Sequence, residues 1–381
     1  DWIEIFNTSI SPVSSEGYFL TDDEKSPNKW KLPNTIIPPN GYLVFFASGK
    51  DRINENNYSH ANFSLSARGE YLALTFNGSP SSEFTPIYPD QYKNVSYGFN
   101  TINGSEGYFS KSTPGEMNGP IDYSSKVSDT KFDIDRGFYQ SPFNVKITTK
   151  TKGSTIIYTI DGSNPSLDNG TKVVNEDPQQ QISATLYIDK TTTLRAAAFK
   201  QGLIPSNIDT QTYLFLDDIV TQTERPEGYP YPWVSRNGQS IEGDYGMDPN
   251  VVGKLYSLEE IKESLLDIPT VSIVTDKNNL FGTQSGIQVN PRDSGSSSER
   301  EISIEFINFE NSENSQENAG IRMNGNASRL VSRPKHNLRV IFRDDYGKGT
   351  LNYPLFGPEA ETNRFNSIIL RGGNGNSWIH P

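Results

Sequence analysis

The sequence contains no cysteine, which excludes disulfides, thiolate metal sites and cysteine nucleophiles together. Histidine is nearly as scarce, with three residues in 381, so a histidine-rich zinc site is not expected. No stretch approaches the roughly 18 consecutive apolar residues that a membrane-spanning helix requires. Any chemistry therefore depends on carboxylates, lysines, arginines or hydroxyl groups. The lack of cysteine does not by itself define the cellular compartment.

Basic residues are also under-represented, because 34 lysines and arginines face 46 aspartates and glutamates and leave a net charge of −12. This charge repels nucleic acid and anionic membranes over most of the surface, so we expect neither partner. The chain begins at Asp1, without methionine and directly in a strand-like segment. We therefore expect that the natural protein extends further at this end, and the missing signal peptide says nothing about location.

What the sequence does contain is typical of β-sandwiches. Glycine (31) and proline (24) are frequent, and 20 phenylalanines and 19 tyrosines supply the apolar area. At roughly 150 residues per domain, the length predicts two to three domains. Residues 1–118 form a first all-β module, with predicted strands at 2–6, 17–20, 42–47 and 71–76 between proline, asparagine and glycine turns.

A second β-module is predicted at 134–216, after an unpatterned linker at 119–133. Its strongest strand is 143–148, where apolar and polar residues alternate strictly. Residues 217–266 form a connector with one convincing helix, whose start is the capping box of Ser257 and Glu260. From residue 267 the chain returns to strands, at 270–274, 302–309, 320–323, 338–342 and 367–370. We expect this third domain to be cut short at Pro381.

The most informative window is 320–343, which holds six basic residues and no acidic one. These are Arg322, Arg329, Arg333, Lys335, Arg339 and Arg343. If 335–343 is a strand, Leu338, Val340 and Phe342 share a core face and the cations project from the other face. Such a face suits nucleotide phosphates, because arginine offers paired donors and lysine a point charge. An exposed strand with solvated charges explains the same spacing, and the residues alone favour that interpretation.

Other candidates have simpler structural explanations. Asp133 with Asp135 and Asp161 with Asp168 lack the dense oxygen ligands of a calcium loop and are predicted to form turns. The segment 347–350 (GKGT) lacks the context of a phosphate loop and is predicted as a hairpin turn. Asp344 and Asp345, near the basic strand, suit either a turn or a metal. The aromatics at 229–233 are predicted to pack rather than to stack on sugars.

Three families resemble successive parts of the chain. The segments 1–7 (DWIEIFN), 17–23 (GYFLTDD), 30–33 (WKLP), 39–43 (PNGYL) and 63–70 (FSLSARGE) resemble the lamin-tail domain. The segments 158–163 (YTIDGS), 193–196 (TLRA) and 202–206 (GLIPS) resemble the chitobiase/hexosaminidase C-terminal domain, over about 134–216. Both resemblances imply immunoglobulin-like sandwiches with scaffold or binding roles and no catalysis.

The third resemblance is to the CotH family of atypical kinases, from about residue 268 to the end. It rests on 320–329 (GIRMNGNASR), 333–342 (RPKHNLRVIF), 346–347 (YG), 353–356 (YPLF), 370–371 (LR) and 377–380 (SWIH). This resemblance implies ATP-dependent phosphorylation of Ser or Thr in proteins, with Mg²⁺ or a similar ion. It places Lys335, Arg322 and Arg339 at the ATP phosphates. Where many members carry a second lysine, this chain has His336.

The same resemblance puts the metal-binding and catalytic carboxylates beyond Pro381, so we expect no kinase activity from these 381 residues alone. The sequence as a whole predicts a mainly β protein with two sandwiches followed by a truncated α+β CotH-type domain at 267–381. We expect a secreted or cell-surface protein of the CotH kinase family. The alternative is a non-catalytic protein that binds polysaccharide or protein at the cell surface.

Overall fold

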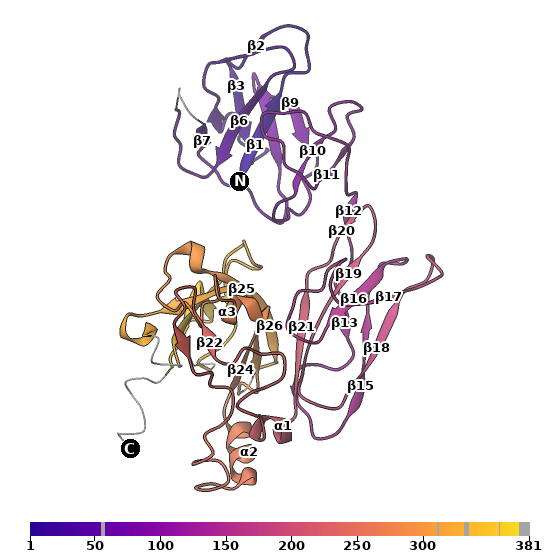
Figure 1. Cartoon of the computed structure of the whole chain (residues 1–381). Helices are drawn as coiled ribbons and strands as arrows, with labels where there is room; N and C mark the ends of the chain where they lie inside the picture. The colour runs from indigo at the N-terminus through magenta and orange to yellow at the C-terminus, as the bar shows by residue number, and fades with distance from the viewer. Residues whose placement is uncertain (55–57, 311, 331–334, 358, 373–381) are drawn as a thin grey trace. The chain divides into compact units, whose positions relative to one another are not determined.

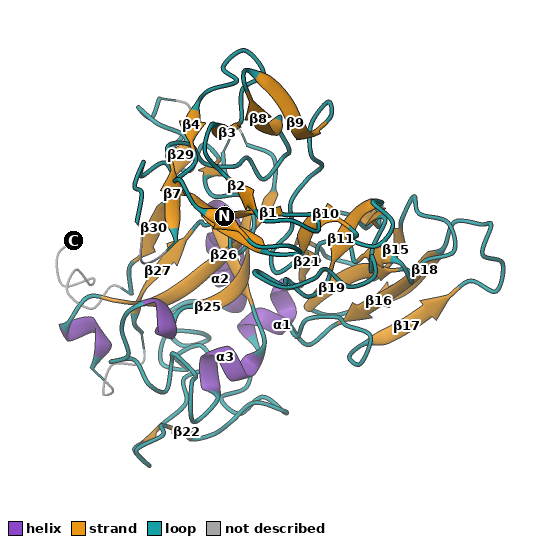
Figure 2. Cartoon of the chain, turned by 90° about the horizontal axis from the view of Figure 1, so that it is seen from above, coloured by secondary structure: helices purple, strands orange, loops and turns teal. Residues whose placement is uncertain are grey.

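The computed structural model describes residues 1–54, 58–310, 312–330, 335–357 and 359–372. The chain consists of two compact units, Asp1–Ser125 and Lys126–Pro381, which we call the N-terminal and C-terminal units (Figure 1). The described chain is mainly β, with few and short helices, which are coloured purple among the orange strands in Figure 2. None of the described helices is both long and apolar enough to cross a membrane.

The N-terminal unit is built from two main sheets around one core. One sheet has the order β1 (Trp2–Phe6), β6 (Tyr42–Ala47) and β7 (Ser59–Ala61); the other has the order β4 (Trp30–Lys31), β3 (Tyr18–Thr21), β8 (Leu72–Phe76) and β9 (Ser79–Phe84). Smaller pairs are β2 (Val13–Ser14) with β5 (Ile36–Ile37) and β10 (Ser96–Phe99) with β11 (Glu106–Phe109). The Trp30 ring meets Phe45 edge-on, with centroids 5.3 Å apart, and ties the two sheets together.

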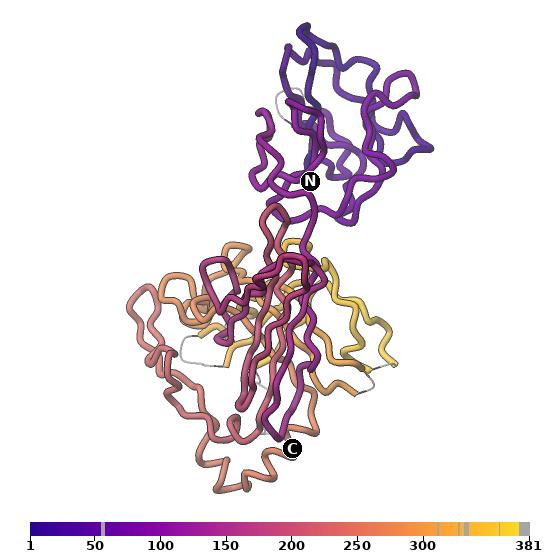
Figure 3. The backbone as a smooth tube through the Cα atoms, turned by 90° about the vertical axis from the view of Figure 1, so that its right-hand side faces the viewer, coloured from indigo at the N-terminus to yellow at the C-terminus, as the bar shows by residue number. Residues whose placement is uncertain are grey.

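A sandwich of a three-stranded and a five-stranded sheet begins the C-terminal unit, and its adjacent strands can be followed in Figure 3. The first sheet has the order β13 (Lys131–Phe132), β15 (Phe143–Thr148) and β18 (Ser183–Ile188). The second has the order β14 (Gly137–Phe138), β21 (Asp209–Leu214), β19 (Thr192–Phe199), β16 (Thr155–Thr159) and β17 (Thr171–Val174). The alternation predicted for 143–148 is confirmed, because Val145 and Ile147 are fully buried and Lys146 is exposed.

The second half of the predicted linker 119–133 is instead part of this sandwich. Val127 is buried and its N–H donates to the Ile204 carbonyl (2.9 Å), beside the short β20 (Leu203–Ile204). The Thr130 hydroxyl donates to the Asp209 carboxylate (2.5 Å), and β13 pairs with β15. The short alternation at 131–132 was too brief to signal a strand, and pairing with β15 decides it.

The connector contains two helices, α1 (Leu216–Val220) and α2 (Leu258–Asp267), and the pair β22 (Trp233–Val234) with β23 (Ser240–Ile241). The predicted capping box of α2 is confirmed: the Ser257 hydroxyl accepts from the Glu260 N–H, and the Glu260 carboxylate accepts from the Ser257 N–H. No residue of α2 is buried. A third helix, α3 (Lys277–Phe281), was not predicted, nor was α1; both are a single turn or little more.

A five-stranded antiparallel sheet, the C-terminal sheet, carries the last part of the unit. Its order is β24 (Thr270–Val274), β25 (Arg300–Ile307), β26 (Ser315–Asn324), β27 (Asn337–Ile341) and β30 (Ser367–Leu370). The short strands β28 (Leu351–Asn352) and β29 (Arg364–Phe365) pair beside it. One face, here the core face, buries Ile304, Ile321 and Val340 with their neighbours. The opposite face, here the outer face, carries the polar alternates of the same strands.

The sandwich covers the outer face at β24 and β25. Glu305 of β25 is completely buried there, and its carboxylate accepts from Arg136 Nε (2.9 Å) and from the Thr212 backbone N–H (3.0 Å). The Thr212 hydroxyl, on β21, donates to the same carboxylate. Arg136 also donates from Nη2 to the Thr210 carbonyl (3.1 Å). A buried carboxylate therefore joins the sandwich to the sheet with its charge fully partnered.

Candidate functional site

Two arginines lie directly opposite each other on the outer face, at the strands beyond β25. Arg322 of β26 is in register with Arg339 of β27. Both side chains are partly buried, and among the described residues neither forms an ion pair. Like charges directly opposite in antiparallel strands are destabilising, so this pair needs a reason other than stability.

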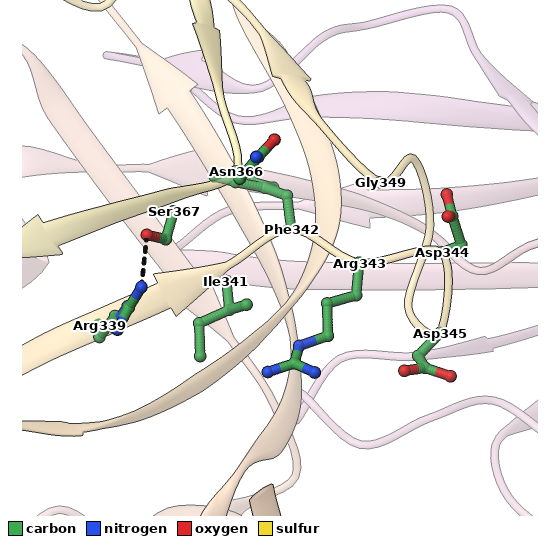
Figure 4. Close-up of a pocket in the computed structure, with 9 residues that line it drawn as sticks. All are labelled: Arg339, Ile341, Phe342, Arg343, Asp344, Asp345, Gly349, Asn366 and Ser367. Carbon is green, nitrogen blue, oxygen red and sulfur yellow. Dashed lines mark hydrogen bonds between the residues drawn. The ribbon is translucent and has the colours of Figure 1, made fainter. Parts of the chain in front are cut away.

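Arg339 is held by only one of its donors. Its Nη2 donates to the Ser367 hydroxyl of β30 (3.1 Å), as Figure 4 shows. Its Nε is inaccessible to solvent and has no hydrogen-bond partner among the described residues. Buried donors are nearly always hydrogen-bonded in folded proteins, so Arg339 is less completely satisfied than most buried side chains.

A third arginine, Arg343, follows β27 by two residues and belongs to the same side of the chain. Its Nε lies 3.2 Å from Glu299 Oε1, and its Nη2 donates to Glu299 Oε2 (3.4 Å). The Glu299 side chain is only 3% exposed, whereas that of Arg343 is 44% exposed. Arg343 is therefore anchored on one side and open to solvent on the other.

Arg339 and Arg343 line one open cavity of about 490 Å³, which falls in the range that holds small-molecule ligands. Its wall is completed by Ile341, Phe342, Asp344, Asp345, Gly349, Asn366 and Ser367 (Figure 4). The cavity thus combines two guanidinium groups with two carboxylates, and Arg322 stands opposite Arg339 in register. We call this the arginine cavity.

A turn brings Asp344 and Asp345 to the cavity. The N–H groups of Tyr346 and Gly347 both donate to the Arg343 carbonyl (3.0 and 3.1 Å). The Asp344 carboxylate packs against Gly349, where a Cβ would lie 2.5 Å from Asp344 Oδ1. The predicted hairpin at 347–350 is wrong in one respect: the segment leads to β28, which pairs with β29 and not with β27. The strand β28 follows the two glycines directly, where a phosphate loop would have a helix, so this segment is not a phosphate loop.

The predicted strand 335–343 begins at Asn337, and Lys335 precedes it. Lys335 is exposed and is not among the residues that line the arginine cavity. His336 is buried, and its Nδ1 lies 2.6 Å from the Ser328 carbonyl oxygen. In the alternation of the strand it falls on the same side as Val340, which is the core side. Burial lowers the pKa of His336, because desolvation disfavours the charged imidazolium. His336 therefore does not replace a second lysine on the outer face.

The predicted core face of β27 is confirmed, because Val340 and Phe342 belong to the buried core cluster and the partly buried Leu338 packs against it. Arg333 and the motif 377–380 lie outside the described residues, as does most of the glycine-rich segment 371–376. Sequence reasoning missed Glu299 and Ser367, which hold Arg343 and Arg339. Neither residue has a local signal, because both reach their arginine from a distant segment.

The weaker candidates have structural roles. The Asp161 carboxylate accepts from the Ser163 N–H (3.0 Å), and Asp133 accepts from the Lys146 N–H (2.6 Å), so both serve the local backbone. Trp233 is buried and stacks on Phe281 with centroids 5.3 Å apart, which confirms that it packs. Within the described ranges, no three His, Asp or Glu side chains come together to hold a metal.

Comparison with known families supports one part of the chain. Residues 134–210 match the chitobiase/beta-hexosaminidase C-terminal domain, which confirms the predicted resemblance in this part of the sandwich. No curated protein and no solved structure matches the chain significantly.

Proposed function

We propose that the C-terminal sheet binds the phosphates of ATP in the arginine cavity, and that the complete protein is a CotH-type kinase that phosphorylates Ser or Thr of other proteins. The observation that carries this proposal is the unpartnered arginine pair. Arg322 and Arg339 face each other without an acidic partner among the described residues, and Arg339 Nε is buried without an acceptor. A phosphate supplies the negative charge that this pair lacks, and its oxygens accept hydrogen bonds from the accessible N–H groups of arginine.

The carboxylates of the cavity suit the same ligand. Proteins commonly hold Mg²⁺ with one or two carboxylates and the substrate phosphates, rather than with a cage of their own. Asp344 and Asp345 would hold the ion in this way, and the ion would screen them from the phosphates. The metal would neutralise charge on the nucleotide, while Arg339 holds a phosphate oxygen and Ser367 fixes the direction of the guanidinium.

Titration calorimetry of the chain with ATP and Mg²⁺ tests the binding step. Arg339→Ala should weaken ATP binding about tenfold or more, because a charge-assisted hydrogen bond is lost. Arg322→Ala should weaken it less, since Arg322 is outside the cavity wall. Arg68→Ala is the matched control, because it removes the same charge from an exposed position of the N-terminal unit. Unchanged affinity in Arg339→Ala, or no binding at all, refutes the proposal.

Lys335→Ala distinguishes the phosphate contact implied by the family resemblance from the contacts offered by the arginine cavity. The family resemblance assigns Lys335 to the phosphates, whereas the cavity wall contains Arg339 and Arg343 instead. A loss in Arg339→Ala that exceeds the loss in Lys335→Ala favours the cavity. Transfer is tested in the complete protein with radiolabelled ATP and an added protein acceptor. Label on Ser or Thr that disappears in Arg339→Ala is the expected result.

A second candidate function is non-catalytic binding of polysaccharide or protein at the cell surface. The observation in its favour is the match of 134–210 to the chitobiase/beta-hexosaminidase C-terminal domain, a domain type named after sugar-hydrolysing enzymes. Polysaccharide retention by the chain, together with absent ATP binding, would favour this candidate. For either function we propose a secreted or cell-surface location.

A further inference from the structure

Arg343 is held so that only part of its guanidinium is engaged. Nε and Nη2 face the Glu299 carboxylate, at 3.2 and 3.4 Å from its two oxygens. Within the described chain, Nη1 of Arg343 has no hydrogen-bond partner. Of the five N–H donors of a guanidinium, the two on Nη1 of Arg343 therefore remain for an acceptor in the cavity. An arginine anchored in this way loses less conformational freedom on binding than a free one.

Glu299 reaches Arg343 because position 320 has no side chain. A Cβ on Gly320 would lie 2.8 Å from Glu299 Oε1 and 2.5 Å from Cε2 of the Tyr346 ring. Both side chains therefore occupy the space over Gly320 on the outer face of β26. The Tyr346 hydroxyl also hydrogen-bonds to Glu299, and burial with this carboxylate raises the pKa of Tyr346 to about 12. Glu299 is thus fixed from two sides, by Tyr346 and by Arg343.

Arg339 and Arg343 are four residues apart, roughly 13 Å along an extended chain. Both line the arginine cavity, with Ile341 between them (Figure 4). The two guanidinium groups therefore come from separate places on the cavity wall. A single phosphate at Arg339 leaves Arg343 unused, whereas a chain of phosphates offers oxygens to both.

We infer that Arg343 is a further phosphate-binding side chain, that Glu299 and Tyr346 position it across Gly320, and that the cavity selects polyphosphate chains over single phosphates. This inference rests on the proposed function, because it assumes phosphate at Arg339. It assigns Glu299 as a positioning residue and Arg343 as the residue that determines specificity.

Binding of ATP, inorganic tripolyphosphate and AMP to the chain, each with Mg²⁺, tests the inference. The parent chain should bind ATP and tripolyphosphate more tightly than AMP. Arg343→Ala should weaken ATP and tripolyphosphate about tenfold and leave AMP nearly unchanged, whereas Arg339→Ala should weaken all three. Arg68→Ala should change none of the three affinities. If Arg339→Ala has no effect, the proposed function fails; if it acts but Arg343→Ala leaves the ATP-to-AMP ratio unchanged, only this inference fails.

Glu299→Gln tests positioning, because glutamine keeps the shape of the side chain and removes its charge. If Glu299 positions Arg343, the preference for ATP over AMP should fall several-fold. A purely structural role for Glu299 would lower the melting temperature without changing this preference. If the preference rises instead, Glu299 competes with the ligand for Arg343, and the positioning role is wrong. In the Arg343→Ala background, Glu299→Gln should have no further effect on the ratio.

Discussion

On the outer face of the C-terminal sheet, β25 and β27 present charged side chains in different surroundings. Glu305 of β25 is fully buried, with Arg136 and Thr212 of the sandwich around its carboxylate. Arg339 of β27 is partly buried and opposes another arginine, with one donor left unpaired. The first arrangement satisfies charge within the chain, whereas the second leaves it without an acidic partner among the described residues. Four predictions test this difference, from the largest expected effect to the smallest.

Substitution in the buried ion pair of Arg136 and Glu305 should lower the free energy of unfolding more than any of the other substitutions. Arg136→Ala leaves the Glu305 carboxylate buried without its cation, and removal of one partner of a buried ion pair costs about 3–5 kcal/mol. We expect a loss near the lower limit, because Thr212 still donates to the carboxylate. Urea denaturation measures this loss in the free energy of unfolding, and hydrogen exchange of the backbone amides in β21 and β25 shows whether it arises at this contact.

The matched control replaces both partners. Arg136→Met with Glu305→Leu removes both charges, and such replacements are often neutral or stabilising. The double variant should therefore recover much of the lost stability. A double variant as unstable as Arg136→Ala would show that the contact depends on polar geometry and not on charge compensation.

Gly320→Ala should have the next largest effect, because its Cβ would overlap the Tyr346 ring and Glu299. Overpacking of this kind costs about 1–3 kcal/mol. Gly119→Ala is the control, since nothing lies within 4 Å of a Cβ there and its backbone is not left-handed. Thermal unfolding of both variants gives the comparison. Equal melting temperatures would mean that the ring and the carboxylate move aside freely.

Neutralising Arg322 should change stability by less than about 1 kcal/mol, in the stabilising direction, because it relieves the repulsion from Arg339. The gain should shrink as salt screens the two charges. Arg343→Gln should do the opposite, since it removes the cation beside the nearly buried Glu299. Melting temperatures at low and high ionic strength test both signs. Destabilisation by Arg322→Gln at low salt would contradict the claim that Arg322 and Arg339 repel each other without an acidic partner.

The smallest effect should come from His336, on the core side of β27. Its pKa is lowered by burial, so the unfolded chain binds a proton more readily than the folded chain. The contribution of His336 is fully present above the ordinary pKa of about 6.5 and is lost as the pH falls through the folded value. His336→Gln should flatten this part of the curve of unfolding free energy against pH. An unchanged slope in the variant would assign the loss to other groups.

Local patterns in the sequence were sufficient for much of the fold. The predicted ranges of β1, β6, β24 and β30 agree with the structure, and the capping box of α2 is present. These elements can be predicted from local sequence, because their residues alternate between apolar and polar or because a hydrogen bond joins near neighbours in the chain. The helices α1 and α3 have five residues each, which is too short for a periodic signal.

The candidate site was only half predictable. Alternation along β27 placed Arg339 opposite the core, and this much follows from 335–343 alone. The same reasoning extended the strand to Lys335, because nothing local marks its start at Asn337. It could not identify Ser367 as the partner of Arg339, because 28 residues separate them in the sequence.

The order of polar and apolar residues determined which face of each strand is buried, since side chains alternate across any strand whatever its neighbours. It thereby put a row of cations on the side of β27 away from the core. Which charges are then satisfied was decided only by the tertiary structure. Glu305 meets Arg136 across 169 residues, and Glu299 meets Arg343 across 44, past a glycine that leaves room. Such pairings depend on strand order and register, which no local pattern encodes.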